Sequence, residues 1–136
     1  MTHFKWEPEL DIYVTDMNEQ HKILIDMMNG IYDLNHQGAS KSALAEALDK
    51  LKAYTQFHFG EEERFMELMN YDDTERHKII HAHLLAELKN HINKFKDSHF
   101  SLGKDFFYFL RYWLSTHIQH IDRKYGEASL PLDTAC

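Results

Sequence analysis

One apolar stripe dominates the sequence between residues 44 and 69, which read LAEALDKLKAYTQFHFGEEERFMELM. Within it, side chains recur at alternating steps of four and three residues, the spacing that places them on one face of a helix. The positions on this face are Leu44, Leu48, Leu51, Thr55, His58, Glu62, Phe65 and Met69. A spacing sustained in this way predicts a helix that packs lengthwise against others in a bundle.

The same spacing occurs in three further segments, and no proline interrupts the chain between Pro8 and Pro131. We therefore expect an all-α protein, an antiparallel up-down-up-down four-helix bundle with a non-helical N-terminal arm. The arm should occupy about residues 1–15, the helices about 16–37, 41–69, 73–96 and 102–125, and a C-terminal tail the remainder. The length of 136 residues is that of one domain, which should span 1–136.

Composition and charge exclude several classes of function. The net charge of −7 has the wrong sign for a phosphate-binding surface, so we expect no nucleic-acid partner. No apolar run approaches the ~20 residues of a membrane span. The single cysteine, Cys136, excludes an intrachain disulfide and a cysteine-based zinc site. The first residues lack the apolar segment of a signal peptide, so a cytoplasmic location is expected. We also expect a monomer.

The abundance of histidine, 11 residues in all, is unusual, and several histidines fall on core-facing positions. The in-register histidines and carboxylates that can meet at one level of the bundle are His21, His58, Glu62, His77, His81 and His117. Burying an unpaired carboxylate costs several kcal/mol, and no lysine or arginine stands in a stripe to pair with Glu62. The pairs His58/Glu62 and His77/His81 are both i, i+4, so each points from one helix face. A metal site in the bundle interior would satisfy these groups together.

The donor set narrows the choice of metal. Imidazoles and carboxylates without thiolates disfavour copper(I) and structural zinc. The HExxH motif of zinc proteases is absent. No glutamate stands three residues before a histidine, which excludes the carboxylate-rich ferritin-like di-iron site.

The series His21, His58-x-x-x-Glu62, His77-x-x-x-His81 and His117-x-x-x-x-Asp122 resembles the ligand signature of the hemerythrins, in particular their single-domain bacterial branch, the bacteriohemerythrins. The segment Trp113-Leu114-x-x-His117 is similar too, whereas Asn18 stands where that branch has aspartate. The resemblance covers nearly the whole chain. It implies two iron ions bridged by an oxo or hydroxo group, and reversible O2 binding for oxygen storage, transport or delivery to an oxygen-consuming acceptor protein, without catalysis.

The resemblance also implies a role for each residue. His77, His81 and His117 would hold one iron, His21 and His58 the other, and Glu62 and Asp122 would bridge the two. With the bridging group, these ligands leave one coordination position open on the iron with two histidines, as a small-ligand site requires. The implied apolar wall of the O2 pocket consists of Leu24, Phe59, Trp113, Leu114 and Ile118.

Two questions stay open at this point. In an ideal α-helix Asp122 would lie about 140° around the axis from His117, so it reaches the site from the edge or through a π-bulge. His120 is the geometric alternative. The same centre could also serve an O2 or redox sensor module, nitric oxide or peroxide detoxification, or iron buffering.

Overall fold

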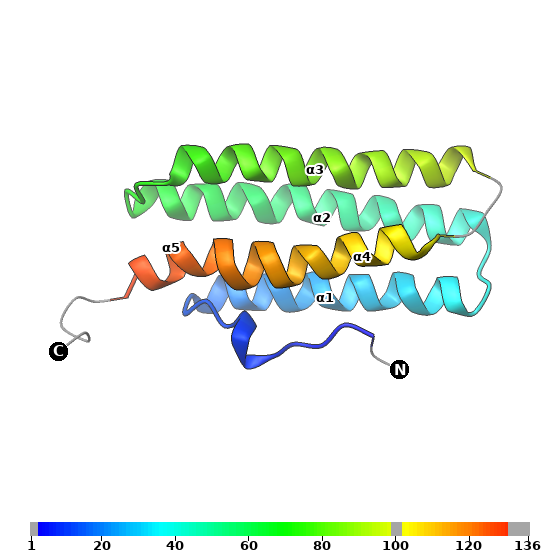
Figure 1. Ribbon diagram of the computed structural model, residues 1–136, viewed down its shortest axis with the longest axis horizontal. Coiled ribbons are helices and arrows are strands. Elements are labelled where there is room, and N and C mark those ends of the chain that lie inside the picture. Colours follow the sequence, from blue (N-terminus) through cyan, green and yellow to red (C-terminus); the bar gives the residue numbers. More distant parts are fainter. Residues whose placement is uncertain (1–2, 99–101, 131–136) are drawn as a thin grey trace.

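The computed structural model describes residues 3–98 and 102–130, and every regular element in these ranges is helical. Four long rods lie side by side and alternate in direction (Figure 1). The first three rods are α1 (Thr15–His36), α2 (Lys41–Leu68) and α3 (Thr74–Asp97). The fourth consists of α4 (Lys104–Tyr112), the π-helical segment η2 (Trp113–Asp122) and α5 (Arg123–Ala128). The expected all-α, up-down-up-down bundle is confirmed.

Two details differ from the sequence-based expectation. The arm is not wholly irregular, since it contains one turn of 3₁₀-helix, η1 (Pro8–Leu10), in which the proline presets the backbone angle of the first residue. On α2 the core-facing stripe predicted Phe65 and Met69, but the structure buries Met66 and leaves those two half-exposed. A stripe repeating every 3.5 residues drifts around a helix of 3.6 residues per turn, so the inward position shifts over several turns.

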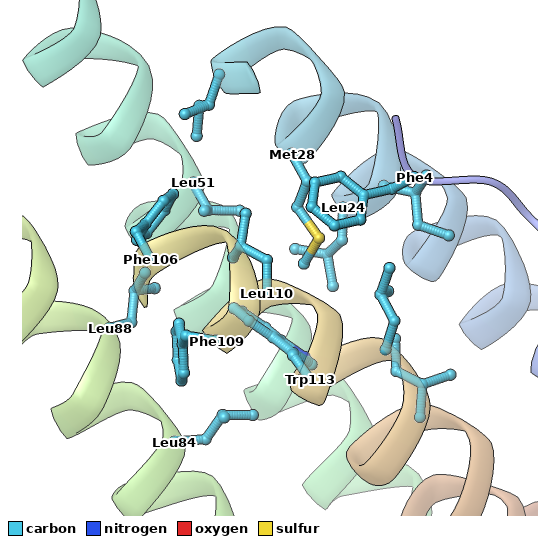
Figure 2. Close-up of a cluster of buried hydrophobic side chains, with 14 of the residues drawn as sticks. Phe4, Leu24, Met28, Leu51, Leu84, Leu88, Phe106, Phe109, Leu110 and Trp113 are labelled. Atoms are coloured by element: carbon cyan, nitrogen blue, oxygen red, sulfur yellow. The ribbon is translucent and has the colours of Figure 1, made fainter. Parts of the chain in front are cut away.

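The apolar core runs along the bundle, and Figure 2 shows one part of it. The arm and all four rods contribute to it, through Phe4, Leu24, Met28, Leu51, Leu84, Leu88, Phe106, Phe109, Leu110 and Trp113. Burying a large apolar side chain contributes about 1.5–3 kcal/mol, so these side chains stabilise the bundle substantially.

The N-terminal arm is tied to the bundle at two places. Near its start, Asn29 of α1 accepts hydrogen bonds from the backbone N–H groups of His3 (3.0 Å) and Phe4 (2.6 Å), and donates to the Phe4 carbonyl (2.7 Å). Near its end, Ile12 is fully buried and its carbonyl lies against Gly126 of α5, where an added Cβ would stand 1.8 Å from that oxygen. Close contact of this kind requires glycine at position 126.

None of the helices formed by residues 3–98 and 102–130 combines the length and the apolar character needed to cross a membrane.

Candidate metal centre

The structure brings all the ligands proposed from the sequence together at one level of the bundle. Every rod contributes, and each of these side chains is at most 3% exposed. The residues are His21 from α1, His58 and Glu62 from α2, His77 and His81 from α3, and His117 and Asp122 from η2. Antiparallel packing therefore matches the depth of residues that lie far apart in the sequence.

These side chains form two overlapping groups. In each group the potential ligand atoms all lie within 4.8 Å of one another. The first group is Glu62, His77, His81, His117 and Asp122, and the second is His21, His58, Glu62 and Asp122. Both carboxylates belong to both groups, which is the arrangement needed to hold two metal ions through two shared carboxylates.

Asp122 faces both groups of histidines with different oxygens. Its Oδ1 lies 2.9 Å from Nε2 of His77 and 3.0 Å from Nε2 of His117. Its Oδ2 lies 3.2 Å from Nε2 of His21. The carboxylate therefore spans the space between the three-histidine group and the two-histidine group.

Glu62 spans the same space from the opposite helix. Its Oε1 lies 3.2 Å from Nε2 of both His58 and His81, so this one oxygen faces both groups. Its Oε2 lies 3.4 Å from Nε2 of His21 and accepts a 2.6 Å hydrogen bond from the Tyr125 hydroxyl. Tyr125 is fully buried and holds the carboxylate from the side of α5.

The inward-facing atoms of this cluster fit a metal. In the described part of the chain, the buried atoms without a hydrogen-bond partner all belong to it: Nε2 of His21, His77, His81 and His117, Nδ1 of His21 and His117, Oε1 of Glu62 and both oxygens of Asp122. Orphaned buried polar atoms are destabilising and rare. Divalent cations coordinated by the Nε2 and carboxylate atoms would satisfy most of them at once.

The charges of the cluster are strongly coupled. Burial alone lowers the pKa of His21, but the carboxylates of Asp122 and Glu62 outweigh it and raise that pKa to about 9. Burial favours the neutral form of Glu62, yet the surrounding histidines hold its pKa well below the ordinary value. Burial and the neighbouring Glu62 carboxylate favour the neutral form of Asp122, but His117 and His21 outweigh them and lower the pKa of Asp122. Both carboxylates are therefore ionised and ready to hold cations.

A change of helix type brings Asp122 into the site. We expected an ordinary helix over 102–125 with at most a local bulge, but the π-helix covers all of Trp113–Asp122. A π-helix takes more residues per turn than an α-helix, so the angle between the directions of His117 and Asp122 is smaller than in an α-helix, and both side chains reach the cluster. His120, the geometric alternative, is exposed and takes no part in either group. π-Helical segments are rare and occur often at functional sites.

Three residues around the cluster were missed from the sequence. Nδ1 of His58 contacts Oε1 of Gln20 at 2.6 Å, and Nδ1 of His81 contacts Oε2 of Glu63 at 2.8 Å. The third is Tyr125. Gln20 and Glu63 each adjoin a proposed ligand in the sequence, but their polarity gave no signal because half-exposed polar residues are common on helices.

The five residues proposed for the O2 pocket, Leu24, Phe59, Trp113, Leu114 and Ile118, are all buried. Phe59 stacks on the ring of His81, with centroids 3.8 Å apart and planes 3° from parallel. Leu114 also lines an open cleft of about 370 Å³ that includes Phe4 and Arg111. Phe59 also lies near His58 and His117, with ring centroids 6.0 and 5.8 Å apart.

Comparisons with known proteins agree with this geometry. Residues 13–128 match the profile of the family described as Hemerythrin HHE cation binding domain. The bacteriohemerythrin of Pseudomonas aeruginosa (strain LESB58) is 30% identical over 128 residues, which cover 94% of this chain and 82% of the relative. That of Methylococcus capsulatus is 33% identical over 109 residues, covering 80% and 82%. A crystal structure of wild-type hemerythrin matches with a TM-score of 0.83 at 31% identity, covering 92% of this chain and 96% of that one.

Proposed function

The chain belongs to the hemerythrin family, and we propose that it binds O2 reversibly at its di-iron centre to store, transport or deliver oxygen. The observation that carries the proposal is the buried cluster in which two carboxylates are shared between a group of three histidines and a group of two. An oxygen-consuming acceptor protein, a monomeric state and a cytoplasmic location belong to the same proposal.

We assign the ligands residue by residue. His77, His81 and His117 would hold one iron, His21 and His58 would hold the other, and Glu62 and Asp122 would be shared by both. When bound, the two iron ions would supply the redox chemistry by which O2 is bound and released. The assignment is supported by the grouping of the ligand atoms and by the opposite directions in which the two oxygens of Asp122 face.

The apolar residues beside the cluster have a separate task. We propose that Leu24, Phe59, Trp113, Leu114 and Ile118 keep water away from the open coordination position. Their burial supports this role. Excluding water strengthens the electrostatic interactions inside the site and protects the ferrous protein from oxidation.

The donor set favours a carrier over an enzyme. Ferritin-like di-iron sites are built from four glutamates and two histidines. This cluster has two carboxylates and five histidines, so it offers less negative charge to stabilise highly oxidised iron. We therefore propose that O2 is returned unchanged.

The test is a metal count combined with absorption spectra. Iron-loaded, reduced protein should contain two irons per chain, develop an O2-dependent absorption band in air and lose it under vacuum through repeated cycles. Irreversible oxidation within seconds, without a reversible band, would contradict the proposal. So would one zinc ion per chain in place of iron.

A further inference from the structure

Two histidines of the cluster each contact a residue outside it, and these two outer residues differ in charge. His81, from the three-histidine group, contacts the carboxylate of Glu63 through Nδ1 at 2.8 Å. His58, from the two-histidine group, contacts the amide oxygen of Gln20 through Nδ1 at 2.6 Å. The cluster therefore has a negative charge behind one proposed metal position and a neutral dipole behind the other.

A histidine that binds a metal through Nε2 carries its proton on Nδ1 and donates it outward. Both contacts fit this tautomer, since Glu63 and Gln20 each present an oxygen. A carboxylate draws the Nδ1 proton more strongly than an amide does, because hydrogen bonds to ionised acceptors are about twice as strong. The imidazole of His81 is therefore the stronger electron donor.

The surroundings keep these contacts in place. The ring of Phe59 stacks on His81, with centroids 3.8 Å apart and planes 3° from parallel. This stacking favours the ring orientation in which Nδ1 faces Glu63. In the described part of the chain Glu63 forms no ion pair with lysine or arginine, and its side chain is 27% exposed. Its charge is thus directed at His81 and only partly screened by solvent.

We propose that Glu63 and Gln20 are positioning residues that make the two metal positions electronically unequal. Glu63 favours the higher oxidation state at the three-histidine position through His81, and Gln20 leaves the two-histidine position better suited to the ferrous state. The inference rests on the proposed ligand assignment and adds to it a means of tuning the centre.

The experiment exchanges acid and amide without changing shape. The variants are Glu63→Gln, Gln20→Glu and the double exchange, and the matched control is Glu61→Gln. Glu61 carries the same charge on the same helix but pairs with Arg64, not with a histidine of the cluster. Three quantities are measured: the Zn²⁺ affinity by chelator competition, the histidine Nδ1–H signals of the zinc-loaded protein by NMR, and the midpoint potential of the iron-loaded protein.

Glu63→Gln should lower the Zn²⁺ affinity about tenfold, within the range known for residues behind metal ligands. It should move the His81 Nδ1–H signal upfield and raise the midpoint potential, by about 59 mV for each tenfold loss of preference for ferric over ferrous iron. Gln20→Glu should shift the His58 signal downfield and lower the potential. The double exchange should move the downfield signal from His81 to His58.

Two results would overturn the inference. One is a Glu63→Gln variant whose His81 signal and potential match the wild type. The other is a Glu61→Gln control that changes them equally, which would show that only distant charge matters. The zinc measurements do not require O2 binding, so a failure of reversible oxygenation alone would count against the proposed function and leave this inference standing.

Discussion

Oδ1 of Asp122 lies 3.0 Å from Nε2 of His117, although the two residues are five positions apart on one helical segment. In an α-helix that spacing would point their side chains about 140° apart. The π-helix over Trp113–Asp122 reduces this angle, and the Asp122 carboxylate lies within the histidine cluster. Of the two candidate residues, Asp122 lies in the cluster and His120 does not.

The first prediction follows from this contact. Asp122→Ala should abolish binding of the iron pair and lower the metal affinity by more than about 100-fold, beyond the range for residues behind the ligands. His120→Ala is the matched control, because His120 is exposed and should be replaceable without loss. Iron content per chain after anaerobic reconstitution measures both. Loss of iron from the His120 variant alone would reverse the assignment.

The second prediction concerns the hydroxyl that supports Glu62. Tyr125→Phe removes a 2.6 Å hydrogen bond to a buried carboxylate oxygen, which should lower the free energy of unfolding by about 1.5–3 kcal/mol. Tyr108→Phe serves as control, since Tyr108 is 64% exposed and should change stability by less than about 0.5 kcal/mol. Urea titration of both variants gives the comparison. Equal effects would mean that the Tyr125 hydroxyl contributes nothing specific.

A third prediction tests the contact between the arm and α5. In Gly126→Ala the new Cβ would stand 1.8 Å from the Ile12 carbonyl oxygen, so the arm must shift. We expect the free energy of unfolding to fall by about 1–3 kcal/mol, the usual range for overpacking. Gly60→Ala, in α2 with open space around the added atom, should instead stabilise the protein by about 0.5–1 kcal/mol. Thermal and urea unfolding distinguish the two, and a neutral Gly126 variant would show that the arm is loosely held.

The fourth prediction concerns pH. In metal-free protein the pKa of His21 is raised from 6.5 to about 9 by its carboxylate neighbours, so the protonated histidine stabilises the fold. That contribution should be complete below about pH 6.5 and disappear as the pH rises through about 9. Metal binding displaces the same proton, so the metal affinity should rise over this interval. Urea titrations and chelator competition from pH 6 to 10 check both trends. A metal-free protein that grows more stable toward pH 9 would contradict the prediction.

Much of the bundle could be read from local patterns. The alternating steps of four and three residues indicate the helices, because helical geometry alone determines which side chains share a face. The prediction that Phe65 and Met69 face the core, instead of Met66, was wrong because the difference between a 3.5-residue repeat and a 3.6-residue turn accumulates along the helix. Periodicity therefore places a residue well over two or three turns and less well over six.

The sequence by itself determined that polar groups face inward on all four helices, because helical periodicity fixes which side chains share a face. It also indicated a metal site, because a buried carboxylate among histidines is costly without compensating cations. Only the tertiary structure decided that Asp122 and not His120 lies in the cluster, since the π-helix over η2 brings Asp122 inward and leaves His120 exposed. It likewise decided the contacts of Gln20, Glu63 and Tyr125, and the need for glycine where Ile12 meets α5. These features arise between segments far apart in the chain, and local spacing carries no information about them.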